Sequence, residues 1–233
     1  MKLEVVVDRV IMRSRNAKSI RFVRPDGFDY LPGQWISLTL GTGDKQWTKP
    51  LSLSSSSTED FLEVTKRLTG HDFSNALNDL KAGDKALMKG PYGSFTLQGG
   101  NDRVCMLSGG IGITPLRSMI RFATDRKLRT SIVLLHSNRY EDGIPFEEDL
   151  DEMERQNPNL RVVKTMTGSA TGWKGLTGRI DPEKIKKAVP DYSERYFYVS
   201  GPGPMVDAMK KMLIGMGLSE VQIKQENFLG YDE

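Results

Sequence analysis

The periodicity of hydrophobic residues along the chain changes once, near residue 99, and this change limits the folds that the chain can adopt. Residues 33–40 alternate with a period of two, which is typical of a half-buried strand. Further short strand candidates, separated by Gly- and Pro-containing turns, occupy residues 3–7, 19–23, 61–68 and 86–89. Strands of this length and spacing predict a small antiparallel β-barrel. One helix interrupts them, with Phe73 and Leu77 on one face and Asp72 as its expected N-cap.

Beyond residue 99, strand and helix candidates alternate. The strand candidates occupy residues 104–108, 131–135, 160–165, 196–200 and 221–224, and the helix candidates occupy residues 115–123, 146–155, 181–189 and 204–216. The pair Asp181-Pro182 has the residue order of a capped helix start. This alternation predicts an α/β domain with a doubly wound parallel sheet. We therefore expect two domains, residues 1–99 and residues 100–233.

Composition limits the chemistry. The 233 residues include one cysteine, Cys105, and two histidines, His71 and His136. A four-cysteine zinc site or an iron–sulfur cluster held by this chain alone is therefore excluded, and we expect no metal. The chain has no apolar run near the ~18 residues that a membrane span needs, and its first residues lack the apolar stretch of a secretory signal. These features predict a cytoplasmic protein without membrane insertion.

The net charge of +3 is small, but residues 1–24 hold seven basic and two acidic side chains. This segment is either a solvated strand face or a docking surface for an acidic partner. We find no nucleic-acid-binding motif and expect no nucleic-acid partner.

Two glycine-containing loops follow strand candidates in the second half. Residues 108–115 read Ser-Gly-Gly-Ile-Gly-Ile-Thr-Pro and open a helix. Glycine lets backbone N–H groups approach a phosphate, although a plain strand-to-helix turn is an alternative. Residues 200–205, Ser-Gly-Pro-Gly-Pro-Met, also lie where a parallel sheet binds ligands, at the carboxyl end of a strand. The methionines that continue this helix at positions 209, 212 and 216 are expected in the core.

Hydroxyl and cationic side chains gather in the first half, at residues 49–55, 66–70 and 73–75. Cations and backbone N–H groups of this kind are able to hold a pyrophosphate, and ordinary loops are the alternative.

In this order, these blocks resemble the ferredoxin–NADP reductase superfamily over nearly the whole chain. Residues 49–52 are similar to the family's Arg-x-Tyr-Ser flavin motif, and residues 70–75 to its Gly-x-x-Ser segment. Residues 90–95 are similar to its Gly-Pro-x-Gly-x-Phe turn. Residues 108–115 and 200–205 are similar to its two nucleotide motifs.

The resemblance implies a flavin-binding barrel followed by a nucleotide-binding domain, with FAD between them. It implies that Lys49 lies at the flavin phosphates, Ser52 near flavin N5, and Ser74 and Asn75 at the pyrophosphate. The other flavin residues that it implies are Pro50, Leu51, Thr65, Lys66, Arg67, Gly70 and Phe73.

For NADP or NAD, the resemblance implies Gly112 and Thr114 at the pyrophosphate and the nicotinamide end. Ser137 and Arg139 would reach the adenosine ribose, and whether Arg139 binds a 2′-phosphate stays open. The other nucleotide residues that it implies are Gly110, Ile113, Asn138, Thr167, Gly201, Pro202 and Met205.

Catalytic roles are implied for Ser52, Ser200, Glu226 and Phe228. Phe228 would shield the flavin until nicotinamide arrives, and Glu226 would relay a proton. A frayed tail is the alternative for residues 226–233.

Three positions depart from the family pattern. Lys49 replaces an arginine and cannot make a bidentate contact. Leu51 replaces a tyrosine whose ring covers the flavin, and Ser200 replaces a cysteine.

The chain is therefore expected to be a flavin-dependent NAD(P)H oxidoreductase that exchanges electrons with an external carrier such as ferredoxin or flavodoxin. Three alternatives stay open: an electron-transfer subunit of a larger oxygenase or dehydrogenase, a reductase of free flavin or small molecules, and a nucleotide-binding module that has lost flavin.

Overall fold

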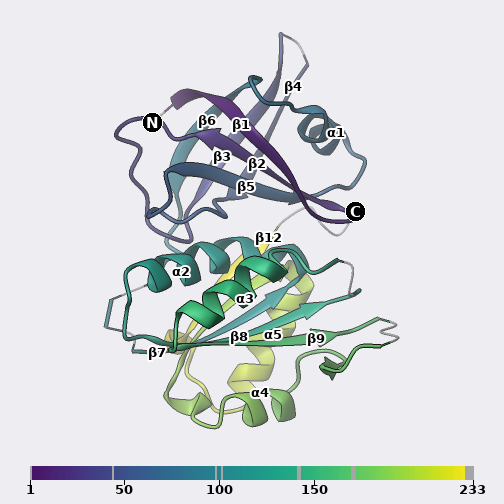
Figure 1. Cartoon of the computed structure of the whole chain (residues 1–233). Coiled ribbons are helices and arrows are strands. Elements are labelled where there is room, and N and C mark those ends of the chain that lie inside the picture. Colours follow the sequence, from purple (N-terminus) through teal and green to yellow (C-terminus); the bar gives the residue numbers. More distant parts are fainter. Residues whose placement is uncertain are drawn as a thin grey trace.

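The computed structural model describes residues 2–43, 45–97, 99–100, 102–140, 143–168 and 172–228. It consists of two six-stranded sheets, one antiparallel and formed by the first part of the chain, the other parallel and formed by the rest. The antiparallel sheet lies above the parallel one in Figure 1, with β2 and β5 toward it. The predicted fold class is confirmed.

The antiparallel sheet closes into a barrel. Its strands are β1 (Lys2–Ser14), β2 (Ala17–Val23), β3 (Trp35–Thr42), β4 (Lys45–Ser52), β5 (Phe61–Arg67) and β6 (Lys85–Tyr92). Their order is β4-β3-β6-β1-β2-β5. A bridge between Leu53 and Val64, and a hydrogen bond of 2.8 Å from the Ser54 N–H to the Glu63 carbonyl, join the two outer strands. This closure brings the segment after β4 against β5.

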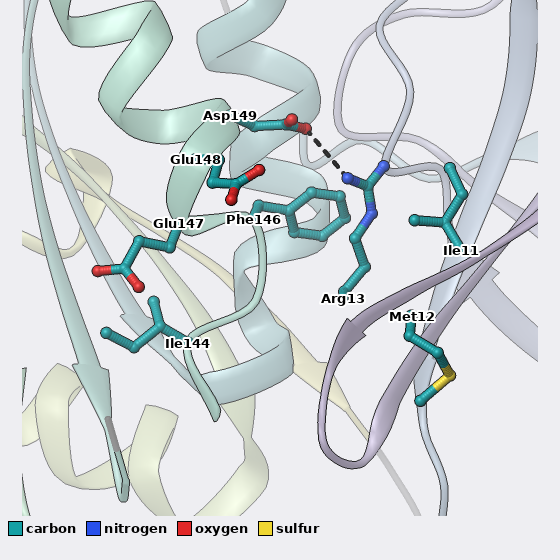
Figure 2. A pocket seen from close by; sticks show the side chains of 8 residues that line it. All are labelled: Ile11, Met12, Arg13, Ile144, Phe146, Glu147, Glu148 and Asp149. Atoms are coloured by element: carbon teal, nitrogen blue, oxygen red, sulfur yellow. Dashed lines mark ion pairs between the residues drawn. The ribbon is translucent and has the colours of Figure 1, made fainter. Parts of the chain in front are cut away.

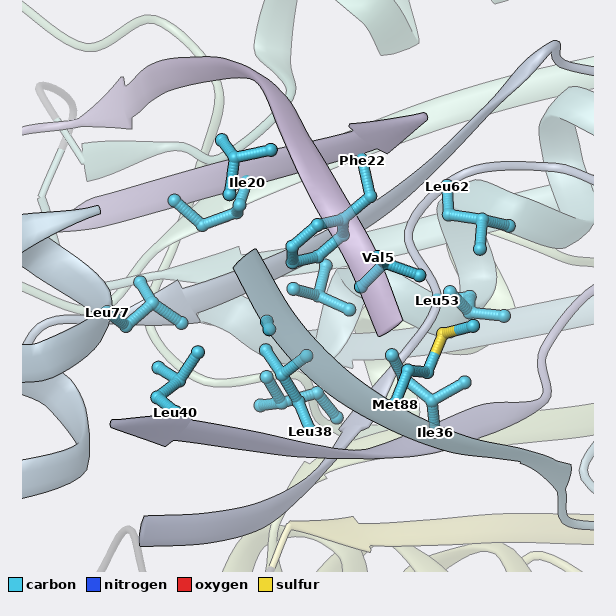
Figure 3. Packing of buried hydrophobic residues seen from close by; sticks show 14 of the residues in the cluster. Val5, Ile20, Phe22, Ile36, Leu38, Leu40, Leu53, Leu62, Leu77 and Met88 are labelled. Atoms are coloured by element: carbon cyan, nitrogen blue, oxygen red, sulfur yellow. The ribbon is translucent and has the colours of Figure 1, made fainter. Parts of the chain in front are cut away.

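The barrel is filled by the inward side chains that the period-two pattern predicts. Leu38 is completely buried at the centre of this core (Figure 3). Helix α1 (Asp72–Asp79) contributes Phe73 and Leu77 to the same core. The predicted N-cap is wrong by one residue, because the helix begins at Asp72 and His71 occupies the cap position without a side-chain hydrogen bond.

Strand β4 was not predicted from the sequence. It pairs with β3 on one side and is mostly exposed, so its side chains do not alternate between apolar and polar. Pro50 lies within it, and proline is tolerated in a strand that is paired on one side only. The hydroxyl- and cation-bearing stretch at residues 49–55 therefore begins in a strand and leaves it after Ser52.

The parallel sheet has helices on both faces. Its strands are β7 (Arg103–Gly109), β8 (Ser131–Asn138), β9 (Leu160–Met166), β10 (Leu176–Thr177), β11 (Tyr196–Pro202) and β12 (Ile223–Phe228), in the order β10-β9-β8-β7-β11-β12. Helices α2 (Ile113–Asp125) and α3 (Glu147–Gln156) cover one face, and α4 (Pro182–Ala188) and α5 (Gly203–Gly215) cover the other. Asp181 caps α4 as predicted, since its carboxylate accepts a hydrogen bond of 2.8 Å from the Lys184 N–H.

Strand β12 extends four residues further than the sequence pattern indicated. It pairs with β11 so that Glu226 lies beside Ser200 and Phe228 beside Pro202. The frayed-tail alternative is therefore wrong for residues 226–228, and residues 229–233 lie outside the described part of the chain. Among the described helices, none has both the length and the apolar character to cross a membrane.

The barrel core supports a direct test. Leu38→Ala removes a completely buried side chain and leaves a cavity, so we expect the free energy of unfolding to fall by about 2–5 kcal/mol. Leu31, which is 60% exposed, is the matched control. We expect Leu31→Ala to change the free energy of unfolding by less than about 0.5 kcal/mol. Equal losses in urea titrations of both variants would contradict the assignment of the core.

Candidate functional site between the barrel and the parallel sheet

A cavity of about 260 Å³ lies between the two domains, and we call it the interdomain cavity. Strands β3, β4 and β5 of the barrel, the start of α2 and strand β12 all contribute to its wall. The lining residues are Trp35, Pro50, Leu51, Ser52, Thr65, Thr114, Glu226, Asn227 and Phe228. Seven of these nine positions were predicted from the sequence; Trp35 and Asn227 were missed.

Three hydroxyl-bearing residues from both domains line this cavity. Ser52 ends β4, and Thr65 lies on β5, where its Oγ1 atom is 2.9 Å from Ser54 Oγ. Thr114 lies in the first turn of α2, and its hydroxyl donates to the Ile111 carbonyl at 3.3 Å. The barrel and the loop at residues 108–115 thus line one space together.

Glu226 is the acidic group of the interdomain cavity. Burial raises the pKa of its carboxyl to about 7, because the charged form is poorly solvated there. A carboxyl with this pKa changes its protonation state near neutral pH. It is therefore suited to exchange a proton with a molecule bound in the cavity.

The loop at residues 108–115 is held by very close packing against β11. A Cβ atom on Gly112 would lie 2.3 Å from the Ser200 carbonyl oxygen, and one on Gly109 would lie 2.2 Å from Met205 Sδ. Position 112 therefore needs glycine, because backbone atoms of β11 leave no room for a Cβ, whereas at position 109 the obstacle is the flexible side chain of Met205 on α5. Ile113 is completely buried in the core of the parallel-sheet domain.

A second, larger cavity of about 560 Å³ lies at the carboxyl ends of β7, β8 and β11; we call it the nucleotide cleft. Eight residues predicted to bind cofactors line it: Arg67, Gly110, Ser137, Asn138, Arg139, Thr167, Pro202 and Met205. Gly109, Ile111 and Pro204 also line it and belong to the nucleotide motifs predicted at residues 108–115 and 200–205. Sequence reasoning missed Arg179, Ile180 and Ala208, and placed Met209 and Met212 in the core only. Arg67 comes from the barrel, so this cleft also draws on both domains.

Asn138 is the most constrained polar group of this cleft. It is 3% exposed, and neither amide atom has a hydrogen-bond partner in the described structure. A buried amide without partners is costly, which indicates that a polar ligand or water completes its bonding.

Two lysines of the barrel lie close enough to repel each other. The pKa of Lys66 is lowered to about 8, first by burial and then by the charge of Lys49. A bound anion would relieve this repulsion and favour both charged forms. The contacts of either lysine with a flavin stay predictions.

The loop before α1 has its polar side chains engaged within the loop itself. Ser74 Oγ accepts from the Thr69 N–H at 2.9 Å, and the Asn75 amide donates to the Gly70 carbonyl at 2.8 Å. Phe73 packs in the barrel core. The contacts that these residues would make with a flavin stay predictions.

The remaining polar residues that the sequence analysis singled out are either buried in the protein interior or exposed to solvent. Cys105 and His136 are completely buried; burial raises the pKa of the Cys105 thiol and lowers that of His136 to about 4. Ser200 is also completely buried, and its hydroxyl has no partner in the described structure. His71 is exposed.

The basic N-terminal segment is largely engaged by the protein itself. Arg13 and Arg21 each contact Glu63 at 2.8 Å. Arg24 donates to backbone carbonyls, and Lys18 donates to the Asn78 carbonyl. Four of its seven cations therefore have structural partners, which weakens both the docking-surface and the solvated-face interpretations.

Comparison with known proteins shows that two kinds of oxidoreductase domain follow each other along the chain. Residues 4–97 match the family model of the oxidoreductase FAD-binding domain, and residues 106–211 match that of the oxidoreductase NAD-binding domain. NADH-cytochrome b5 reductase 1 of Debaryomyces hansenii is 30% identical over 223 residues, which cover 90% of this chain and 77% of that protein. The chain belongs to the oxidoreductases that combine these FAD-binding and NAD-binding domains, the ferredoxin–NADP reductase superfamily. The resemblance seen in the sequence is thereby confirmed.

Other members of the family are similar over nearly the whole chain. The glycine betaine monooxygenase reductase subunit of Pseudomonas aeruginosa is 30% identical over 228 residues, which cover 94% of this chain. The chain spans 62% of the length of that relative.

Solved structures agree in fold. A ferredoxin–NADP+ reductase from Neisseria gonorrhoeae with bound FAD and NADP superimposes with a TM-score of 0.86 at 22% identity, over 97% of this chain and 98% of that one. A cytochrome P450 reductase from Amycolatopsis superimposes with a TM-score of 0.88 at 22% identity, over 98% of this chain and 70% of that one.

The raised pKa of Glu226 predicts a specific pH dependence of stability. Between about pH 4.5 and 7 the carboxyl is protonated in the folded state and ionised in the unfolded state, so stability falls as pH rises through this window. Glu226→Gln removes this loss and is expected to be more stable than the wild type at pH 8 by up to about 3 kcal/mol, but not at pH 4. Thermal unfolding of both proteins at the two pH values checks this, and parallel pH profiles would contradict it.

Proposed function

We propose that this chain is an NAD(P)H oxidoreductase in which hydride passes between nicotinamide C4 and flavin N5 inside the interdomain cavity. The observation that carries the proposal is the convergence of Ser52 and Thr65 of the barrel with Thr114 of the glycine loop and Glu226 of β12. Hydride transfer needs the two reacting atoms about 3–3.5 Å apart, and a cavity walled by both domains is suited to hold them so.

The residues present fit FAD. The repulsion between Lys49 and Lys66 is relieved by a phosphate anion, and the cavity offers hydroxyl groups beside the apolar Trp35 and Leu51. We infer that the lysines hold the flavin phosphates and that Ser52 hydrogen-bonds near N5. FAD, when bound, supplies a hydride acceptor that is able to release electrons one at a time.

The nucleotide cleft fits NADP or NAD. Asn138 offers a buried amide with unused hydrogen-bonding capacity, and Ser137 and Arg139 lie beside it. Arg139 and Arg179 carry positive charge into the cleft, where a phosphate is stabilised by guanidinium groups. We infer that the nucleotide enters over the loop at residues 108–115, with Thr114 at its nicotinamide end.

Roles within the cavity follow from position. Glu226, with its pKa near 7, holds or releases the proton that accompanies electron transfer. Phe228 lines the interdomain cavity, where it would cover a bound flavin until nicotinamide takes its place. Ser200 lies beside Glu226 in the strand register, but its hydroxyl makes no hydrogen bond in the described structure, so a catalytic role for it stays a prediction.

The electrons are passed to an external carrier, for which ferredoxin or flavodoxin is our prediction. A second candidate is the electron-transfer part of an oxygenase system, because relatives include a monooxygenase reductase subunit and a cytochrome P450 reductase fold. We place the domain boundary near residue 99, between Tyr92, which ends the barrel, and Arg103, which starts the parallel sheet. A cytoplasmic location remains a prediction from the sequence.

The visible spectrum of the purified protein tests the proposal. We expect flavin absorbance that bleaches on anaerobic addition of NADPH or NADH, and the faster nucleotide is the preferred one. A flavin that neither nucleotide bleaches would favour a subunit that receives its electrons elsewhere. Absence of flavin after addition of FAD would refute the barrel site and leave the nucleotide-binding module.

Lys49 offers a second test, on cofactor affinity. Lys49→Met is expected to weaken FAD binding about tenfold, or 1.4 kcal/mol, because one phosphate contact is lost. Lys49→Arg is expected to strengthen binding, because a guanidinium group contacts a phosphate through two N–H groups. Lys45, exposed on the same strand, is the control, and Lys45→Met should leave the dissociation constant unchanged. Equal constants for all three variants and the wild type would exclude Lys49 from the flavin site.

A further inference from the structure

Arg117 of α2 joins the two domains although it is only 3% exposed. Its Nη1 atom donates to the Ser54 carbonyl at 3.1 Å, and both Nη atoms donate to the carboxylate of Glu59. Its Nη2 atom also donates to Asp149 of α3 at 3.1 Å. One side chain therefore fastens a loop of the barrel to two helices of the parallel-sheet domain.

Both ends of this contact lie next to the interdomain cavity. Arg117 lies three residues after Thr114 on helix α2, and Thr114 lines the cavity. Ser54 lies two residues after Ser52, which ends β4 and also lines the cavity. The Ser118 hydroxyl adds a second contact, donating to the Ser55 carbonyl at 2.5 Å. A helix turn transmits displacement rigidly, so a shift of Arg117 relative to Ser54 changes the position of Thr114 relative to Ser52.

A second set of contacts runs from α3 to the barrel through Arg13. Figure 2 shows its guanidinium group beside the ring of Phe146, with the ion pair to Asp149 dashed. The Arg13 Cζ atom lies 4.5 Å from the ring centroid, and Nη1 lies 3.7 Å from Asp149 Oδ2. On its other side, Nη2 donates to Glu63 at 2.8 Å.

From Glu63 the contacts reach the wall of the cavity. Ser54 Oγ donates to Glu63 Oε1 at 2.9 Å and is hydrogen-bonded to Thr65 Oγ1 at 2.9 Å. Thr65 Oγ1 also lies 2.7 Å from Ser19 Oγ, which accepts from Arg13 Nε at 2.9 Å. Thr65 is thus held by hydrogen bonds that lead back to the other domain.

Six charged side chains make up this assembly, which we call the interdomain ionic cluster: Arg13, Arg21, Arg117, Glu59, Glu63 and Asp149. Three positive and three negative groups balance. Burial alone would raise the pKa of Glu63, but Arg13, Arg117 and Arg21 outweigh it and hold that pKa below its usual value. Likewise, burial alone would lower the pKa of Arg117, but Glu59 and Asp149 hold it above its usual value.

Stability alone does not account for the cluster. Ion pairs taken out of water lose much of their hydration, and apolar side chains of similar volume are often as stabilising. Ionic and apolar contacts differ in how strictly they depend on geometry. Apolar contacts let two surfaces slide past each other, whereas a hydrogen-bonded guanidinium group fixes the position of one domain relative to the other.

We propose that the interdomain ionic cluster positions the nucleotide loop against the flavin wall, with Arg117 as the central positioning residue for hydride transfer. This inference rests on the proposed function. Because a displacement of about 1 Å in the reacting atoms costs about 100-fold in rate, the cluster sets the rate without contacting either cofactor.

The double variant Arg117→Met/Glu59→Gln tests the inference without leaving an unpaired buried charge. In it, Arg13 and Arg21 still balance Glu63 and Asp149. We expect FAD content and the dissociation constant of NAD+ to stay within about twofold of the wild type. The rate constant of anaerobic flavin reduction at saturating nucleotide is expected to fall about 100-fold, and the nicotinamide–flavin charge-transfer absorbance to weaken.

Two further variants separate position from charge. Arg117→Lys keeps the charge but lacks the planar group that reaches three partners at once, so an intermediate loss of about 10-fold is expected. Arg103→Met removes a half-exposed arginine whose partners, Asp191 and Glu194, lie in its own domain, and it should react at the wild-type rate. A double variant with wild-type rate and charge-transfer absorbance overturns the inference.

A calorimetric measurement without nucleotide keeps this test separate from the proposed function. If nucleotide fails to bleach the wild-type flavin, the proposed function fails, and calorimetry alone then decides whether the cluster couples the domains. We expect one unfolding transition for the wild type and Arg103→Met, and two for the double variant. A single transition for all three overturns the coupling.

Discussion

The arrangement of the site depends on the contact between the backbone of Gly112 and that of Ser200. Because no side chain fits there, the start of α2 rests directly on the carboxyl end of β11. This contact fixes Thr114 above the sheet, and β12 continues the same layer with Glu226. A larger residue at position 112 would lift the helix from the strand and separate groups that come from three parts of the chain.

The sheet register gives this layer a polar character. Ser108, His136 and Ser200 occupy equivalent positions on neighbouring strands, and each has a buried polar atom without a partner in the described structure. The same row continues to Glu226 on β12 and Lys164 on β9. The apolar interior of the sheet thus ends at this row of polar residues. The carboxyl edge is the polar side of the sheet, and the barrel lies against it.

The sequence alone predicted the fold class and many of the residues that line the two cavities. Period-two and helical patterns located the strands around Leu38 and the α/β alternation, and glycine spacing located both loops. Strand β4 was missed because an exposed strand paired on one side carries no apolar alternation, and Trp35 was missed with it, since its place opposite Ser52 depends on that pairing. The contacts of Arg117 were not predictable either, because its partners lie 58 and 32 residues away and no local pattern marks them.

The wall of the interdomain cavity has a consequence for the time at which the site forms. Its groups come from β3, β4 and β5, from the start of α2, and from residues as late as Phe228. During synthesis the barrel strands emerge long before β12, so a nascent barrel is able to close while the cavity still lacks one side. Because such distant contacts form late in folding, assembly of the complete cavity must follow translation of β12. A flavin held by the barrel before that point would be open to water on the side that β12 later covers.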